Sequence, residues 1–122
     1  MRKGKVKELL YQKRIYEQIL KEKDDYLEVL ICLGEIYTYL GEYRKSLKVD
    51  LKISQIIPDQ PHVYYNLACD YSLLGNIEEA FKNLKIALSL GYKDFDSIDK
   101  DPDLENLRKD KRYKNFKKRY FR

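Results

Sequence analysis

Very few residues of this 122-residue chain combine a reactive side chain with the spacing that catalysis or metal binding needs. His62 is the single histidine, which excludes a histidine dyad and a multi-histidine metal site, so we expect an exposed residue at a helix start. Asp99, Asp101 and Asp103 alternate like calcium ligands, but Pro102 interrupts them and the Gly and Glu of a calcium loop are absent. We expect helix capping there instead. The sequence predicts no enzyme, no metal site and no cofactor.

The two cysteines, Cys32 and Cys69, lack the CxxC spacing of a zinc site and fall on separate expected helices. We expect two reduced thiols that pack as small apolar side chains. No apolar run approaches the length that a membrane-crossing helix needs, and charged residues interrupt the apolar part of any secretory signal. The sequence therefore predicts a soluble, cytoplasmic protein.

Basic residues gather at the two ends of the chain, where residues 1–23 have a net charge of +5 and residues 95–122 one of +4. Residues 108–122 interleave basic and aromatic side chains, as surfaces that contact nucleic acid or an anionic membrane do. Tyr113, Phe116 and Tyr120 follow helical spacing, which favours a capping helix packed on the rest of the fold. The two interpretations are compatible. The candidates for anion binding are Arg108, Lys111, Arg112, Lys114, Lys117, Lys118 and Arg119.

The elements that would position these residues are helices arranged in pairs. Between Pro61 and Gly91, apolar residues recur every three or four positions in two runs, which indicates two helices. Gly75-Asn76 separates the runs and favours a tight turn. The pattern recurs at a fixed shift, the repeat period, of about 34 residues, and we therefore predict a repeat protein. The aligned residues are Leu33, Tyr37, Leu40 and Gly41 with Leu67, Tyr71, Leu74 and Gly75.

A further helix is expected at residues 5–23, with an apolar stripe that includes Leu9, Ile15 and Ile19. Ile19 lies one repeat period before Ile53, so this helix takes the place of a second helix whose first partner is missing. Its uncovered edge suggests, as a hypothesis, weak self-association through Leu9 and Ile15.

The helix pairs resemble the tetratricopeptide repeat (TPR) family, whose pattern is W-x2-L-G-x2-Y, then A-x3-F, then P. The matching stretches are Leu30-x2-Leu33-Gly34-x2-Tyr37 and Tyr64-x2-Leu67-Ala68-x2-Tyr71, while Asp50 replaces the expected aromatic residue. Residues 94–121 resemble the tail that closes many bacterial members. The resemblance implies an all-α, TPR-like α-solenoid of antiparallel helix pairs in one domain, 1–122. Its parts are a half-repeat helix at 5–23, full repeats at 26–58 and 61–92, and a helical cap at 94–121.

The family resemblance implies non-catalytic protein–protein interaction, because the first helices of such arrays line a concave groove that binds a peptide or a partner protein. Members that bind acidic C-terminal tails place basic residues in this groove. Here Glu28 and Glu35 have the opposite charge, so we expect no binding of such tails. The alternative is recruitment to nucleic acid or an anionic membrane through the basic C-terminal helix. The expected groove residues are Glu28, Ile31, Cys32, Glu35, Tyr39, His62, Tyr65, Asn66, Cys69 and Leu73.

Overall fold

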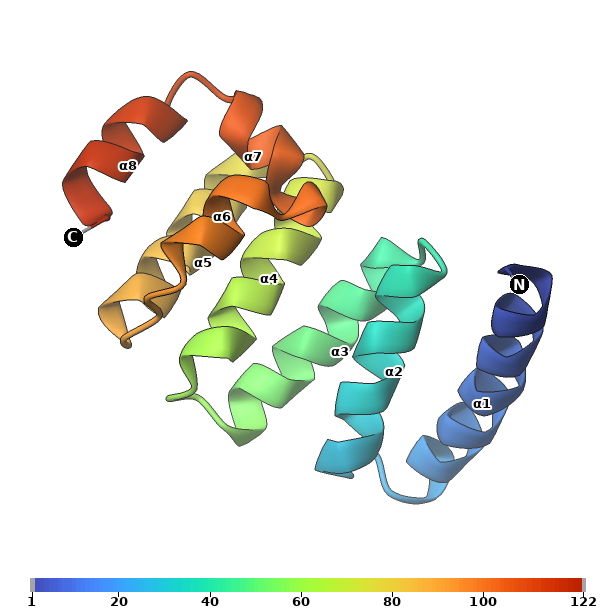
Figure 1. Cartoon of the computed structure of the whole chain (residues 1–122). Coiled ribbons are helices and arrows are strands. Elements are labelled where there is room, and N and C mark those ends of the chain that lie inside the picture. The colour runs from blue at the N-terminus through green and yellow to red at the C-terminus, as the bar shows by residue number, and fades with distance from the viewer. Residues whose placement is uncertain (1, 122) are drawn as a thin grey trace. The chain divides into compact units, whose positions relative to one another are not determined.

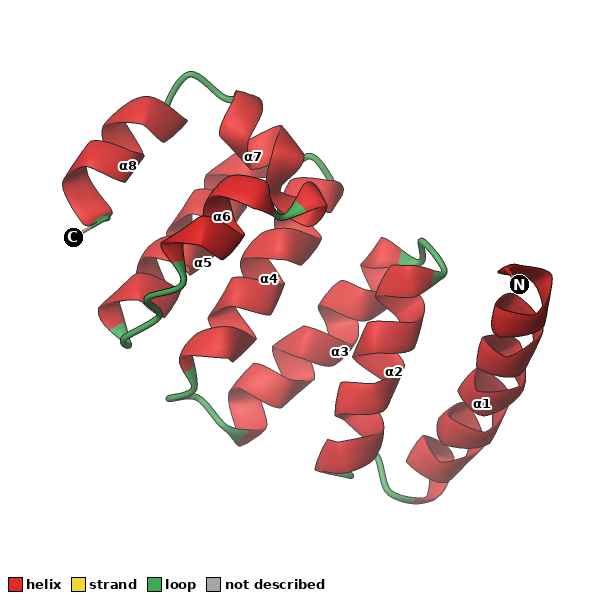
Figure 2. Cartoon of the chain, in the orientation of Figure 1, coloured by secondary structure: helices red, strands yellow, loops and turns green. Residues whose placement is uncertain are grey.

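A computed structural model describes residues 2–121, with side chains from residue 3 onward. Over this range the secondary structure consists of eight α-helices and one 3-10 helix without any strand (Figure 1), and Figure 2 shows only helices and loops. The prediction of an all-α fold is confirmed. Whereas the sequence predicts one domain, the chain divides into two compact units, unit 1 (Met1–Ile56) and unit 2 (Ile57–Arg122).

Unit 1 consists of three helices: α1 (Arg2–Glu22), α2 (Leu27–Tyr39) and α3 (Tyr43–Ile56). α2 packs on both of the others (Figure 1). The turn after α2 depends on Gly41, whose φ of 79° lies in the left-handed region that other residues avoid. The Glu42 N–H then donates to the Tyr37 carbonyl at 2.8 Å, which closes the helix end and turns the chain back into α3.

The contact between α2 and α3 is close at Gly34. A Cβ atom at this position would lie 3.1 Å from the Asp50 Oδ1 atom, so the missing side chain makes room for a buried carboxylate. Ser46, also buried on α3, places its Oγ atom 2.8 Å from Thr38 Oγ1 and 3.4 Å from the Gly34 carbonyl. Small and polar residues thus replace the aromatic packing that the family pattern has here.

Polar contacts fix α1 to the other helices of unit 1. Lys13 Nζ lies 2.9 Å from the Glu42 carboxylate, and this hydrogen bond lowers the pKa of Glu42. The Tyr37 hydroxyl donates to Glu17. Leu9 is 8% exposed and Ile15 is 42% exposed, and weak self-association through these residues stays a prediction.

Unit 2 begins with the helix pair α4 (Pro61–Leu73) and α5 (Ile77–Ser89). Pro61 lies in the first turn of α4, as predicted, where its missing N–H leaves no hydrogen bond unmade. Gly75 ends this helix with a φ of 80°, and the Asn76 side chain then accepts a hydrogen bond from the Glu79 N–H and caps α5. The predicted turn residues are therefore confirmed.

The C-terminal cap is helical, as predicted, but aspartates divide it into short helices: α6 (Phe95–Lys100), η1 (Pro102–Leu104), α7 (Glu105–Lys109) and α8 (Tyr113–Tyr120). Asp94, Asp101 and Asp110 each accept a backbone N–H two or three residues later, at 2.9–3.1 Å. The capping prediction is confirmed for Asp101, whereas the Asp110 side chain bonds the Arg112 N–H and does not cap α8. The cap and α5 share a core in which the completely buried residues are Ala80, Leu84, Ala87, Ile98, Leu104 and Leu107.

The aromatic face of α8 packs on unit 2. The ring centroids of Phe116 and Phe81 are 5.1 Å apart, and Tyr120 lies against Phe116 at 4.7 Å. Phe121 stacks on Phe95 at 4.8 Å. The predicted capping role of this helix is confirmed, because its aromatic side chains join the apolar core of unit 2.

Candidate functional site

The groove residues predicted on α2 remain accessible. Glu28, Ile31, Glu35 and Tyr39 are exposed, and Cys32 is half-buried. Ile31 and Tyr39, at 39% and 54% exposure, are large side chains that α2 presents to solvent. One face of α2 therefore presents two carboxylates and two large side chains.

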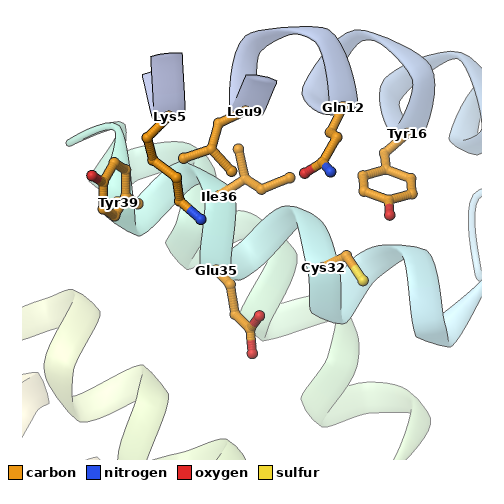
Figure 3. A pocket seen from close by; sticks show the side chains of 8 residues that line it. All are labelled: Lys5, Leu9, Gln12, Tyr16, Cys32, Glu35, Ile36 and Tyr39. Carbon is orange, nitrogen blue, oxygen red and sulfur yellow. The ribbon is translucent and has the colours of Figure 1, made fainter. Parts of the chain in front are cut away.

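A pocket of about 310 Å³ lies between α1 and α2 (Figure 3). Three of the predicted residues line it: Cys32, Glu35 and Tyr39. Ile36 of the same helix lines it with them. Glu28 and Ile31 belong to the same face of α2 but do not line the pocket.

The other wall of this α1–α2 pocket comes from α1, through Lys5, Leu9, Gln12 and Tyr16. Figure 3 shows Lys5 and Tyr39 at one end and Tyr16 and Cys32 at the other, with Leu9, Gln12 and Ile36 between them. Sequence reasoning missed these α1 residues, because it took only first helices as groove walls. The repeat period could have identified two of them. Gln12 and Tyr16 lie one period before Ser46 and Asp50, which face α2.

The pocket combines an apolar middle with polar ends. Leu9 and Ile36 are buried, while the Lys5 and Glu35 side chains are exposed and form no ion pair with any side chain in residues 3–121. Electrostatic interaction with Cys32 raises the pKa of Tyr16, and the neutral Tyr16 hydroxyl offers the pocket a hydrogen bond. This combination suits binding of a group that is apolar at its centre and polar at its edges.

The groove residues predicted on α4 have a different environment. His62 and Asn66 are exposed, as expected, and Leu73 is half-buried. Tyr65 and Cys69 are only 8% and 7% exposed, so the prediction that they face an open groove is wrong. His62 lies in the first turn of α4, which confirms the expectation of an exposed residue at a helix start.

The α6 and η1 segment covers Tyr65 and Cys69. The Tyr65 hydroxyl donates to Asp101 Oδ2 at 2.5 Å and lies 3.0 Å from Ser97 Oγ, and its ring stacks on Tyr92 at 4.5 Å. The Cys69 thiol points at Asp101, and burial raises its pKa far above the usual range. A buried, protonated thiol is a poor nucleophile, so this cysteine packs as an apolar residue.

Some of the predicted anion-binding residues contact other residues of unit 2, and the rest are exposed to water. Arg108 is half-buried, and its Nη1 atom donates to the Ile98 and Asp101 carbonyls at 2.8 and 2.7 Å, so this nitrogen already has partners within unit 2. Arg112 pairs with Asp110 and holds the pKa of that carboxyl at about 2. Lys117 pairs with Asp99 at 2.8 Å, and this contact lowers the pKa of Asp99. Lys111, Lys114 and Lys118 are exposed, and no ion pair among the described residues involves them.

Arg119 is exposed and lies 5.7 Å from the centre of the Tyr120 ring, a cation–π distance. Among the basic residues of 108–121, Lys109, Arg112 and Lys117 form ion pairs with carboxylates of unit 2. These contacts engage part of the positive charge of this segment within unit 2.

The chain is similar to part of one longer plant protein, while no family model matches it. It is 35% identical over 104 residues to a protein of Arabidopsis thaliana whose name describes it as chloroplastic. The match covers 83% of this chain but 29% of the plant protein, so the chain spans less than a third of that relative's length. No helix among the described residues is long and apolar enough to cross a membrane.

Proposed function

We propose that the chain is a TPR-like protein whose function is non-catalytic binding of a peptide or partner protein. The helix starts support the family assignment: α2, α4 and α6 begin at Leu27, Pro61 and Phe95, which follow one another at exactly one repeat period. α3 and α5 begin at Tyr43 and Ile77, with the same period. Repeats of this kind use exposed inner faces for binding, since stacking buries the remaining faces.

The observation that carries the proposed function is the α1–α2 pocket together with the exposed face of α2. Leu9 and Ile36 in the pocket are buried and apolar, and the other lining side chains offer an amide, hydroxyls and both signs of charge. Such a surface recognises side chains without reacting with them. Within the part of the chain that the structure describes, no three His, Cys, Asp or Glu side chains come together as a metal site would require.

Binding to this face is tested with peptides selected from a displayed random library on the immobilised chain. Selected peptides are then titrated by fluorescence anisotropy. We expect Tyr39→Ala to weaken binding by about 1 kcal/mol or more, as is usual for a tyrosine anchor, and binding to change little with salt. Tyr11→Ala is the matched control, because Tyr11 is 66% exposed and lies on α1 outside the pocket. Equal weakening by both variants, or by neither, would refute the proposal.

A second candidate is an anion-binding surface at the C-terminal helix. The exposed positions of Lys111, Lys114 and Lys118 favour it, since the packing of unit 2 leaves these ammonium groups in water. Binding of heparin or RNA should then fall steeply with salt and disappear in the Lys114→Glu, Lys118→Glu double variant. Retention of binding in that variant would exclude this surface.

A further inference from the structure

The walls of the α1–α2 pocket have counterparts in unit 2. α2 and α6 begin at Leu27 and Phe95, two repeat periods apart. Under the same shift α1 falls on α5, and four residues that line the pocket fall on completely buried residues of the unit 2 core. These pairs are Gln12 with Ala80, Tyr16 with Leu84, Ile36 with Leu104, and Tyr39 with Leu107.

A helix fills the corresponding position in unit 2. α4 packs on α5, η1 and α7, and its residues Tyr65, Ala68 and Cys69 share a core with the four buried residues. Hydrogen bonds add to this contact: the Leu107 N–H donates to Ser72 Oγ at 3.1 Å, and the Asn106 amide donates to the Ser72 carbonyl at 3.0 Å. A helix is therefore the element that this chain itself places between such walls.

We propose that the α1–α2 pocket binds one amphipathic helix of a partner protein, held between α1 and α2 as α4 is held in unit 2. The inference rests on the proposed function, because it concerns the same pocket, and it adds the mode of binding and the chemistry of the partner. The apolar side of the partner helix would contact Leu9 and Ile36, while the exposed ends of the pocket contact its polar flanks.

The substitutions between the two units give this pocket polar walls, whereas the corresponding residues around α4 are apolar. Gln12, Tyr16 and Tyr39 take the places of an alanine and two leucines, so the pocket walls carry groups that water can solvate. Polar walls lower the cost of leaving the pocket empty, because their hydrogen bonds pass to water. An interaction with the partner helix would then be reversible.

The charge of α2 specifies one position of the partner. Glu35 corresponds to Asp103 of η1, which packs on α4. The Cys69 thiol of α4 lies 4.0 Å from Asp101 Oδ2, and the other oxygen of Asp101 accepts the Asp103 N–H at 3.0 Å. A partner residue in the place of Cys69 would therefore meet the Glu35 carboxylate. Because α2 contains no basic residue, Lys or Arg fits this position best. By analogy with Tyr65, Ala68 and Cys69 of α4, the partner helix should carry a large apolar residue, a small residue three positions later, and a cation directly after the small residue.

The experiment uses a fluorescent peptide with the sequence of residues 60–76 and the change Cys69→Lys, titrated by anisotropy with the full chain. We expect saturable binding that Glu35→Lys in the chain weakens at least about fivefold, because two like charges then face each other. A peptide with Cys69→Glu should bind the Glu35→Lys chain better than it binds the unchanged one. Glu22→Lys is the matched control: it makes the same charge change at an exposed residue of α1 outside the pocket, and should alter binding less than about twofold.

A second peptide tests whether the bound segment is a helix. Adding Ala68→Pro to the peptide breaks a helix but not an extended segment, so binding should be lost. Retained binding would overturn the helix inference and leave the proposed function intact. Failure of the helical peptides, while library-selected peptides bind through Tyr39, would likewise overturn the helix inference and leave the proposed function intact. If neither set binds, both proposals fail. Light scattering tests a second copy of the chain as the occupant. Dimers that form with rising concentration and that Glu35→Lys abolishes would overturn the inference of a partner protein.

Discussion

α2 and α4 occupy equivalent places in two successive helix pairs but meet different surroundings. Each has 13 residues, and their starts are one repeat period apart. Ile31 and Glu35 on α2 are exposed, whereas the equivalent residues of α4, Tyr65 and Cys69, are buried under α6 and η1. The repeat pattern determines which side of a helix faces away from the other helix of its pair. The element that comes next determines whether that side stays accessible.

The largest expected effect concerns one pair of equivalent residues, Leu107 and Tyr39. Leu107 is completely buried in the cap, so Leu107→Ala should cost about 2–5 kcal/mol of the free energy of unfolding. Tyr39 is 54% exposed, and Tyr39→Ala should change stability by less than about 0.5 kcal/mol. Urea denaturation followed by circular dichroism measures both values. A comparable loss for Tyr39→Ala would mean that the pocket is part of the core, and the contrast between the two units would collapse.

The helix-pair contact should respond alike in both units. Gly34 and Ala68 are equivalent and buried, so Gly34→Leu and Ala68→Leu should each overpack the contact and cost about 1–3 kcal/mol. In unit 1 the new side chain would also meet the Asp50 carboxylate, since even a Cβ atom comes within 3.1 Å. Thermal unfolding of the two variants tests this. A neutral result at Gly34 alone would show that the unusual residues of α3 leave a looser contact.

The covering of α4 is itself testable through one hydroxyl group. Tyr65→Phe removes the hydrogen bonds to Asp101 and Ser97 and should cost about 0.5–1.5 kcal/mol. Tyr39→Phe, on the exposed face of α2, serves as the control and should have no measurable effect. Hydrogen exchange would localise the change, with faster exchange of α6 amides in the Tyr65→Phe variant. Unchanged exchange there would show that this hydroxyl does not hold the covering segment.

Much of the fold could be predicted from the sequence, because local residue chemistry decides it. The glycines at positions 41 and 75, the first-turn Pro61 and the apolar spacing of three and four specify each helix and each turn. The capping aspartates were also recognisable, since an Asp before Pro or before a short helix has few other structural uses. These features act within a few residues of one another.

The candidate site could be predicted only in part, because exposure depends on contacts between distant segments. The α2 residues were correctly expected to be accessible. Tyr65 is covered by a segment that contains Ser97 and Asp101, which lie 32 and 36 residues later in the chain. The repeat period does not predict that an interrupted helix covers this tyrosine. The contribution of α1 to the pocket was missed for a similar reason. The number of basic residues also overstated the anion-binding surface, because the Arg108 guanidinium donates hydrogen bonds to carbonyl groups of unit 2.

The smallest predicted effect compares how the two units respond to acid. In unit 1 the hydrogen bond from Lys13 lowers the pKa of Glu42 from its usual 4.5, and in unit 2 Lys117 lowers that of Asp99 from 3.8. A carboxylate with a lowered pKa stabilises the fold above its unfolded-state pKa, and this stabilisation is lost as the pH falls through the folded-state value. Unit 1 should therefore begin to lose its contribution at a higher pH than unit 2.

Each contribution should stay below about 1 kcal/mol, because both carboxylates are partly exposed, at 29% and 32% of the side chain. The urea midpoint, followed from about pH 7 to pH 3, should fall less steeply in Glu42→Gln than in the unchanged chain, and the change should appear nearer the ordinary Glu pKa. Asp99→Asn should flatten only the more acidic part of the curve. If the curves of both variants match that of the unchanged chain, neither lysine pair contributes measurably to stability.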